Sequence, residues 1–152
     1  MGRWVVENYD AVIRYKRLNK EGIEPKYARA GDSGLDLYSV DELIMKPHSW
    51  SLISTGIAIE LPKGYEAQVR SRSGLALKHG IFTLNSPGTI DEGYRDELKV
   101  ILANFSDYDY KVSVGDRIAQ LVLAKRYDCQ MLEVSELSET ERGTGGFGST
   151  GT

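Results

Sequence analysis

The sequence predicts an all-β fold, a jelly-roll-like β-sandwich with one short helix. Three observations indicate it. Short apolar or alternating segments recur at nearly regular spacing along the 152 residues. Turn residues, chiefly glycine and proline, separate these segments. Finally, a single short stretch has the composition of a helix, and no internal repeat is visible.

The first half of the chain opens with a strand-like alternation over residues 11–18. A polar segment follows at 20–29, and because Gly22 and Pro25 interrupt it, we expect a loop. A turn at 32–34 then leads into the next strand. The remaining strands expected in this half are 35–38, 43–45, 51–54, 56–61 and 65–70.

The one expected helix is SGLALKHG, residues 73–80. Ser73 is a residue type that caps helix starts, and the Leu-Ala-Leu-Lys run that follows favours helix. Gly80 suits a left-handed C-terminal cap, because glycine adopts positive φ without steric cost. The sequence therefore predicts a helix that begins at Ser73 and ends before Gly80.

The second half is arranged around the turn Asn-Ser-Pro-Gly at 85–88. Proline presets φ and glycine tolerates positive φ, so this is a strong turn signal. We expect the flanking apolar runs, 81–84 and 98–102, to be arms of a hairpin or adjacent strands. Further expected strands are 98–104, 110–114, 117–124 and 131–134.

From Ser135 onward the sequence reads SELSETERGTGGFGSTGT, without periodicity and with few apolar residues. We therefore expect a β domain over 1–137 and a flexible, glycine-rich C-terminal lid over 138–152.

Composition limits the function classes. The net charge of -3, without long runs of one sign, argues against stable nucleic-acid binding. No apolar run approaches the roughly 18 residues that span a membrane, and Cys129 is the only cysteine, so we expect a cytoplasmic protein. His48, His79 and one cysteine are too few for a typical zinc site, so any divalent metal is expected to be Mg²⁺, bound by oxygen and largely through a phosphate ligand.

Two stretches combine residues suited to chemistry. Asp91 and Tyr94 follow the central turn, where a carboxylate and a ring could share a pocket wall; the alternative is that Asp91 and Glu92 belong to a solvated turn. Residues 72–74, Arg-Ser-Gly, stand where the expected helix begins and where free backbone N–H groups favour an anion. The alternative there is an ordinary helix cap beside a surface arginine.

Other polar residues are less specific on their own. Arg117 and Gln120 interrupt an apolar strand and are expected at a rim or an interface, and Asp36 is similar. The tail combines Arg142, Phe147 and small hydroxyl residues, which suits a lid over a nucleotide. Its alternative is a low-complexity linker with an incidental aromatic residue.

Together these segments resemble the five ordered motifs of the trimeric dUTP pyrophosphatase (dUTPase) family. They read AGDSGLDLYS, RSRSGLALKHG, GTIDEGYRDEL, GDRIAQLVL and RGTGGFGSTG, in order from residue 30 to residue 151. The resemblance implies a jelly-roll subunit that forms a homotrimer with three shared active sites. Each site would take the third motif from one subunit, the first, second and fourth from a neighbour, and the tail from the third subunit.

The resemblance also implies an activity: hydrolysis of dUTP to dUMP and pyrophosphate by attack of water on the α-phosphorus. This limits uracil incorporation into DNA and supplies dUMP for thymidylate synthesis. In this comparison Asp91 is the catalytic base that activates the water. Asn85 reads uracil, Tyr94 packs under deoxyribose, and Thr89 lies among the substrate-binding residues.

The other motifs are implied to hold the phosphates. Arg72, Ser73 and Gly74 would form a cradle, with Ser73 near the bond being broken, so that Ser73 counts as catalytic. Arg117 would buttress the site, and Asp36 and Gln120 would hold water molecules on Mg²⁺, the implied cofactor. The lid residues would be catalytic Arg142 on the γ-phosphate and, over the nucleotide, Phe147, Gly148, Ser149 and Thr150.

Two other functions stay open. A dCTP deaminase, or a bifunctional relative, would share the jelly roll and the trimer, and Glu97 is the acid we would nominate for its chemistry. A nucleotide-binding module would bind without turnover.

The motifs depart from the usual family pattern at three positions. Ser71 stands where proline is usual, Thr89 where an aliphatic residue is usual, and Asp96 where glycine is usual. Asp96 adds a side chain and a charge directly after Arg95, so we hypothesise an activity below the family norm. Equal turnover and thermal stability in Asp96→Gly would contradict this hypothesis.

Overall fold

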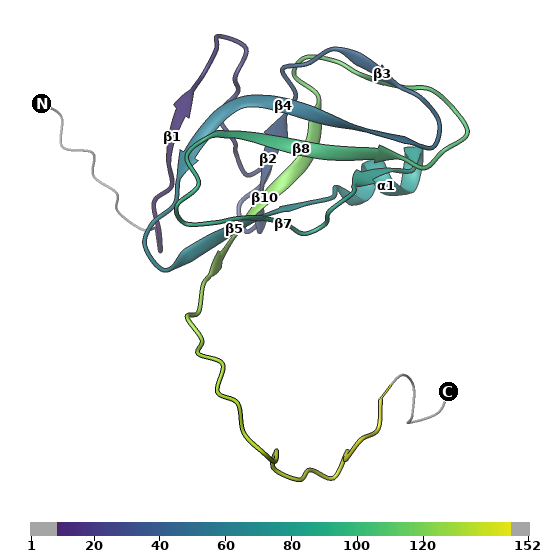
Figure 1. The fold of residues 1–152 in the computed structure, drawn as a ribbon. Helices are drawn as coiled ribbons and strands as arrows, with labels where there is room; N and C mark the ends of the chain where they lie inside the picture. Colours follow the sequence, from purple (N-terminus) through teal and green to yellow (C-terminus); the bar gives the residue numbers. More distant parts are fainter. Residues whose placement is uncertain (1–8, 147–152) are drawn as a thin grey trace, which may run out of the picture.

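Two four-stranded antiparallel sheets and a two-stranded ribbon form the fold of residues 9–146, the part of the chain that the computed structural model describes (Figure 1). The first sheet has the order β1 (Arg14–Arg17), β4 (Ser49–Glu60), β8 (Glu97–Asn104), β6 (Ile81–Thr83). The second has the order β2 (Gly34–Tyr38), β10 (Arg117–Lys125), β5 (Tyr65–Arg70), β7 (Gly88–Ile90). The ribbon pairs β3 (Leu43–Met45) with β9 (Tyr110–Val112).

Both sheets contribute to one hydrophobic core. In β8, Leu98, Val100 and Leu102 are fully buried while the intervening Lys99 is exposed, which is the period-2 alternation of a strand with one face covered. Leu121 of β10 belongs to the same cluster. Burying a side chain of this size stabilises the fold by about 1.5–3 kcal/mol before entropy is counted. The predicted all-β sandwich is confirmed.

Two strand predictions were wrong. Residues 51–54 and 56–61 belong to one strand, β4, because Gly56, with φ of +67°, forms an irregularity that bends the strand without ending it. Residues 131–134 form no strand: the side chains of Met131 and Leu132 are 91% and 77% exposed. Apolar composition is not enough there, because no strand within residues 9–146 pairs with this segment.

The expected helix is α1 (Ser73–His79). Gly80 ends it as predicted, with φ of +65° and a backbone N–H that donates to the Ala76 carbonyl. The expected cap is wrong: the N-cap is Arg72, whose backbone is extended, and Ser73 is already the first helical residue. No side chain makes a capping hydrogen bond at this end of the helix, so the hydroxyl of Ser73 does not define where it starts.

The chain between β6 and β8, two strands of the first sheet, contributes a strand to the second sheet. β6 pairs with β8, so the prediction that these two runs are adjacent strands is confirmed. The intervening β7 pairs instead with β5, where Gly88 is opposite Val69. The 85–88 turn and the loop after β7 therefore connect one sheet to the other.

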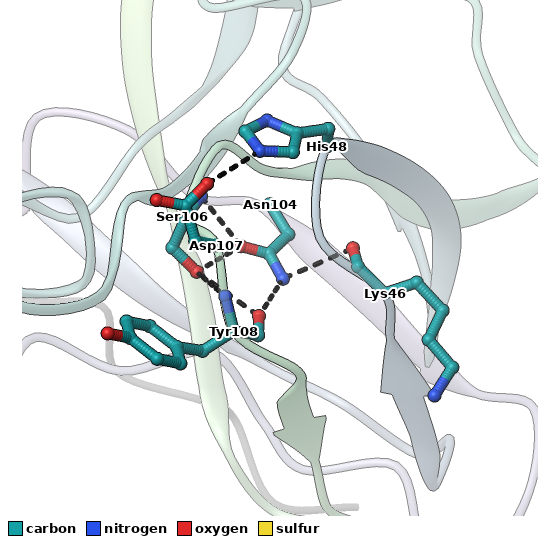
Figure 2. A network of polar contacts seen from close by, with 6 residues as sticks. All are labelled: Lys46, His48, Asn104, Ser106, Asp107 and Tyr108. Atoms are coloured by element: carbon teal, nitrogen blue, oxygen red, sulfur yellow. Dashed lines mark hydrogen bonds and ion pairs between the residues drawn. The ribbon is translucent and has the colours of Figure 1, made fainter.

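A network of polar contacts lies at the end of β8, around the Asn104 side chain (Figure 2). The Asn104 side chain is buried, and its Nδ2 lies 2.8–3.2 Å from the backbone carbonyl oxygens of Met45, Lys46 and Tyr108. Its Oδ1 accepts hydrogen bonds from the backbone N–H and the hydroxyl of Ser106. One amide thus joins the turn before β4 to the loop after β8.

Beyond β10 the described chain, residues 126–146, contains neither helix nor strand and runs away from the sandwich (Figure 1). The domain boundary at residue 137 stays a prediction. Over the described range, the helix is too short to cross a membrane.

Candidate active site

Three of the five motifs meet around one polar cavity of about 270 Å³. It lies where β2, the start of α1 and β10 come together, so residues far apart in the sequence share its wall. The lining residues are Ala28, Asp32, Ser33, Gly34, Asp36, Arg72, Ser73, Gly74, Arg117 and Gln120.

Asp36 is the shared partner of two arginines in this cavity. Its side chain is only 11% exposed, with Oδ1 3.3 Å from Arg72 Nε and Oδ2 3.2 Å from Arg117 Nη1. Arg72 Nη1 also donates to the Arg117 carbonyl oxygen at 3.0 Å. Asp36 and Asp32 balance the charges of Arg72 and Arg117 in this wall, but the two guanidinium groups still present N–H donors, which suit a phosphate group. The sequence predicted all three residues as site residues, but it did not predict that the Asp36 carboxylate contacts both arginines.

The Gln120 side chain packs directly against Gly34, so a larger residue at position 34 would displace the Gln120 amide. Its Nε2 donates to the Ser71 carbonyl at 2.9 Å, and a Cβ on Gly34 would collide with its Oε1. Gly34 and Gln120 lie on neighbouring strands, β2 and β10. Sequence reasoning treated Gly34 only as a turn residue, since nothing local in the sequence marks its contact with residue 120.

The second motif brings Ser73 and Gly74 to the exposed first turn of α1. A Cβ on Gly74 would meet open space, so packing within this chain does not require glycine there. Ser71, which stands where the family usually has proline, accepts a hydrogen bond from the Thr83 backbone N–H at 2.9 Å. The hydroxyl therefore ties this motif to β6.

The third motif lies apart from the cavity lining. Asn85, Thr89, Asp91 and Tyr94 are all exposed and do not line the cavity. Asp91 and Tyr94 share one turn, in which the Tyr94 N–H donates to the Asp91 carbonyl at 3.0 Å. The Tyr94 hydroxyl donates to the Glu97 carbonyl at 2.7 Å. One chain therefore presents the carboxylate and the ring outward.

The other acids near this turn are engaged in hydrogen bonds. Asp96 is exposed, and its Oδ1 accepts from the Glu97 backbone N–H at 2.7 Å. Glu97, the acid considered for deaminase chemistry, accepts from the Gly56 N–H at 2.8 Å, and its side chain is 17% exposed. Its carboxylate is thus committed to holding the irregularity of β4.

The fifth motif is described only in part. Arg142 is exposed, and its Nε donates to the Gly145 carbonyl oxygen at 2.9 Å. Arg142 does not line the cavity of its own chain, and the tail that contains it runs away from the sandwich (Figure 1). The remaining lid residues, Phe147, Gly148, Ser149 and Thr150, lie outside the described residues.

The donor set of the cavity does not form a metal cage. Within residues 9–146, no group of three or more His, Cys, Asp or Glu side chains could hold a metal ion. Asp36 and Gln120 do supply oxygen atoms at the cavity, and each carboxylate oxygen has a second lone pair beside its arginine contact. These residues fit a cation carried by phosphate groups and contacted through water.

Comparisons with known proteins agree with this geometry. A model of the dUTPase family matches residues 20–151. The deoxyuridine 5′-triphosphate nucleotidohydrolases of Helicobacter pylori (strain J99) and Clostridioides difficile are each 55% identical to this chain over 139 residues. These matches cover 91% of this chain and 96% and 97% of the respective relatives.

Solved structures give the same likeness. The Staphylococcus bacteriophage 80alpha dUTPase with dUPNHPP has a TM-score of 0.86 at 28% identity, over 93% of this chain and 99% of that chain. A dUTPase from phage phi11 of S. aureus, described with a structural Mg(II) ion, has a TM-score of 0.78 at 22% identity. That match covers 84% of this chain and 99% of the phage protein.

Proposed function

Because the chain belongs to the dUTPase family, we propose that it hydrolyses dUTP to dUMP and pyrophosphate. The observation that carries the proposal is the cavity in which Asp36 orients Arg72 and Arg117. Two oriented guanidinium groups bind and stabilise the negative charge that builds on phosphate during phosphoryl transfer. The reaction would limit uracil incorporation into DNA and supply dUMP; action in the cytoplasm stays a prediction.

Asp91 is the proposed general base. A carboxylate at the end of an exposed loop can accept a proton from a water molecule that attacks the α-phosphorus. Tyr94 shares the Asp91 turn, which supports its proposed place under deoxyribose, where a 2′-hydroxyl would clash. Asn85 and Thr89 precede this turn; Asn85 would read the uracil base, and Thr89 would lie among the substrate-binding residues.

The cavity would receive the phosphate chain. Arg72 and Ser73 line it, and the open space around Gly74 leaves room for a ligand to approach the backbone. From the fifth motif, the lid residues Arg142, Phe147, Gly148, Ser149 and Thr150 would close over the bound nucleotide.

Mg²⁺ is the proposed cofactor. Asp36 and Gln120 would contact it through water while the phosphates bind it directly, since the described part of the chain offers no cage. When bound, the ion supplies charge that stabilises the leaving pyrophosphate. Asp36 also keeps the two arginines aimed at the phosphates.

A homotrimer is the proposed assembly. The Asp91 loop is exposed and absent from the cavity lining, so a site that uses both needs a second copy of the chain. Mixing Asp91→Asn with Arg72→Ala subunits tests this. Random exchange into trimers would restore about a quarter of the sites, because some sites combine an intact loop with an intact cavity. Mixtures as inactive as the separate variants would contradict sites shared between subunits.

The activity is tested by incubating the protein and Mg²⁺ with dUTP, dCTP, dTTP and UTP separately, while pyrophosphate and ammonia are measured. Pyrophosphate from dUTP alone is the expected result. Ammonia from dCTP would favour the deaminase, although the bond between Glu97 and Gly56 argues against it. Binding without any product would favour the nucleotide-binding module.

A further inference from the structure

Glu92, the residue after Asp91, is anchored to two distant segments of the chain. Its Oε2 accepts a hydrogen bond from the Gly64 backbone N–H at 2.8 Å and lies 3.4 Å from Arg126 Nη2. Gly64, with φ of +83°, is in the turn between β4 and β5, and Arg126 directly follows β10. The Gly64 carbonyl in turn accepts from the Arg126 N–H at 2.9 Å. One carboxylate therefore joins the Asp91 loop to a turn and to the start of the tail.

The other side-chain hydrogen bonds of this loop are local. The Tyr94 hydroxyl donates to the Glu97 carbonyl, and Arg95 Nη1 donates to the carbonyls of Glu92 and Tyr94. These contacts shape the turn, but they join residues at most three positions apart. One ion pair, between Arg95 Nη2 and Glu60 Oε1 at 3.9 Å, also reaches the sandwich. The Glu92 contacts are shorter and connect the loop to the Gly64 turn and to the end of β10.

The environment of Glu92 favours a permanent anion. The Gly64 N–H and the Arg126 guanidinium hold the pKa of the Glu92 carboxyl below its ordinary value, against the opposing effect of burial. The carboxylate is therefore ionised at neutral pH, and a charged acceptor makes a stronger hydrogen bond than a neutral one.

We propose that Glu92 is a positioning residue that holds the Asp91 loop at the angle that catalysis requires. The proposal rests on the assignment of Asp91 as general base above. Glu92 itself would contact neither the nucleotide nor the attacking water, because its Oε2 is bonded to Gly64 and Arg126, and it would act through the placement of Asp91. A displacement of about 1 Å at a catalytic group can lower a rate by two orders of magnitude.

The test compares Glu92→Ala, which removes the acceptor, with Glu92→Gln, which keeps an amide oxygen for the Gly64 N–H. We expect Glu92→Ala to lower kcat for dUTP by roughly ten- to a hundredfold with little change in KM, because Asp91 loses its placement. Glu92→Gln should recover most of kcat. The matched control is Glu42→Ala, which removes a surface carboxylate 2.9 Å from Lys111 and should leave both constants unchanged.

A second measurement needs no substrate. Hydrogen exchange of the backbone amides of residues 91–96 in the full-length, nucleotide-free protein should be faster in Glu92→Ala and near wild type in Glu92→Gln. Unchanged exchange and unchanged kcat in Glu92→Ala would overturn the proposal. So would a raised KM with normal kcat, since that pattern places Glu92 on the substrate. Failure of the proposed function would look different, because the wild-type protein would then release no pyrophosphate from dUTP. The exchange measurement would still show whether the Glu92 contacts hold the loop.

Discussion

The cavity and the Asp91 loop, the two halves of the proposed site, differ in how far their side chains are buried and bonded within one chain. In the cavity, Asp36 is nearly buried and orients Arg72 and Arg117, so the side chains constrain one another within one chain. In the loop, Asp91 and Tyr94 are exposed, and their surroundings within the chain are mostly backbone. The fold completes the proposed phosphate side of the site within one chain and presents Asp91, the proposed general base, outward. Substitutions in the two halves should therefore fail in different ways.

The largest effect is expected from Asp91→Asn. Removing the general base should lower kcat for dUTP by about 10²–10⁴-fold. Nucleotide affinity should change little, because the cavity and the loop backbone persist. Pyrophosphate release and calorimetric binding of dUTP measure the two quantities. Asp96→Asn, which alters an exposed acid of the same loop, is the control and should retain activity; equal losses in both variants would contradict the assignment.

Ending the chain after Leu137 should have the next largest effect. The sandwich should melt at the wild-type temperature, because the described part of the tail makes no strand with it. Removing Arg142 and the residues after it should lower kcat/KM by roughly a hundredfold, the scale for losing a charge-stabilising donor. A fully active truncated protein would identify the tail as a plain linker.

Asp36→Asn tests the cavity half. The two arginines would lose their shared counter-charge, so we expect KM for dUTP to rise by roughly ten- to a hundredfold, with a lower melting temperature. Asp32→Asn is the matched control, since Asp32 also lines the cavity but bonds only to the Arg29 backbone among the described contacts. Similar KM values for the two variants would show that Asp36 does not orient the arginines.

Asn104→Ala should separate stability from activity. It leaves buried carbonyls of the Figure 2 network without their donor, which should lower the free energy of unfolding by roughly 2–4 kcal/mol. Denaturant titration measures the loss. Well below the melting temperature, kcat/KM should match wild type, because the network lies outside the cavity lining; a selective loss of activity would connect this network to the site.

The smallest effect, a gain in stability, is expected from Thr83→Val. Among the described residues, the Thr83 hydroxyl is the buried side-chain oxygen without a hydrogen-bond partner. Valine keeps the shape and removes the unpaired group, so the free energy of unfolding should rise by up to about 1 kcal/mol. A loss of stability would indicate that the hydroxyl has a partner in solution.

The strands were predictable where one face of a segment repeats every second residue, as at Leu98, Val100 and Leu102. The same reasoning failed at 131–134, where apolar residues have no partner strand, and at Gly56, where a glycine bends a strand instead of ending it. The site residues could be predicted from the order of the five motifs in the sequence. The contacts between these residues could not be predicted, because residues such as Asp36 and Arg117 are 81 positions apart.

By itself, the sequence determined which segments favour strands, where the chain turns and which chemical groups each motif carries, because these properties depend on neighbouring residues. Only the tertiary structure decided that Asp36 joins two arginines, that Gln120 packs against Gly34, and that Glu92 reaches the Gly64 turn. Those contacts depend on strand pairing and register, which bring together residues that no local pattern relates.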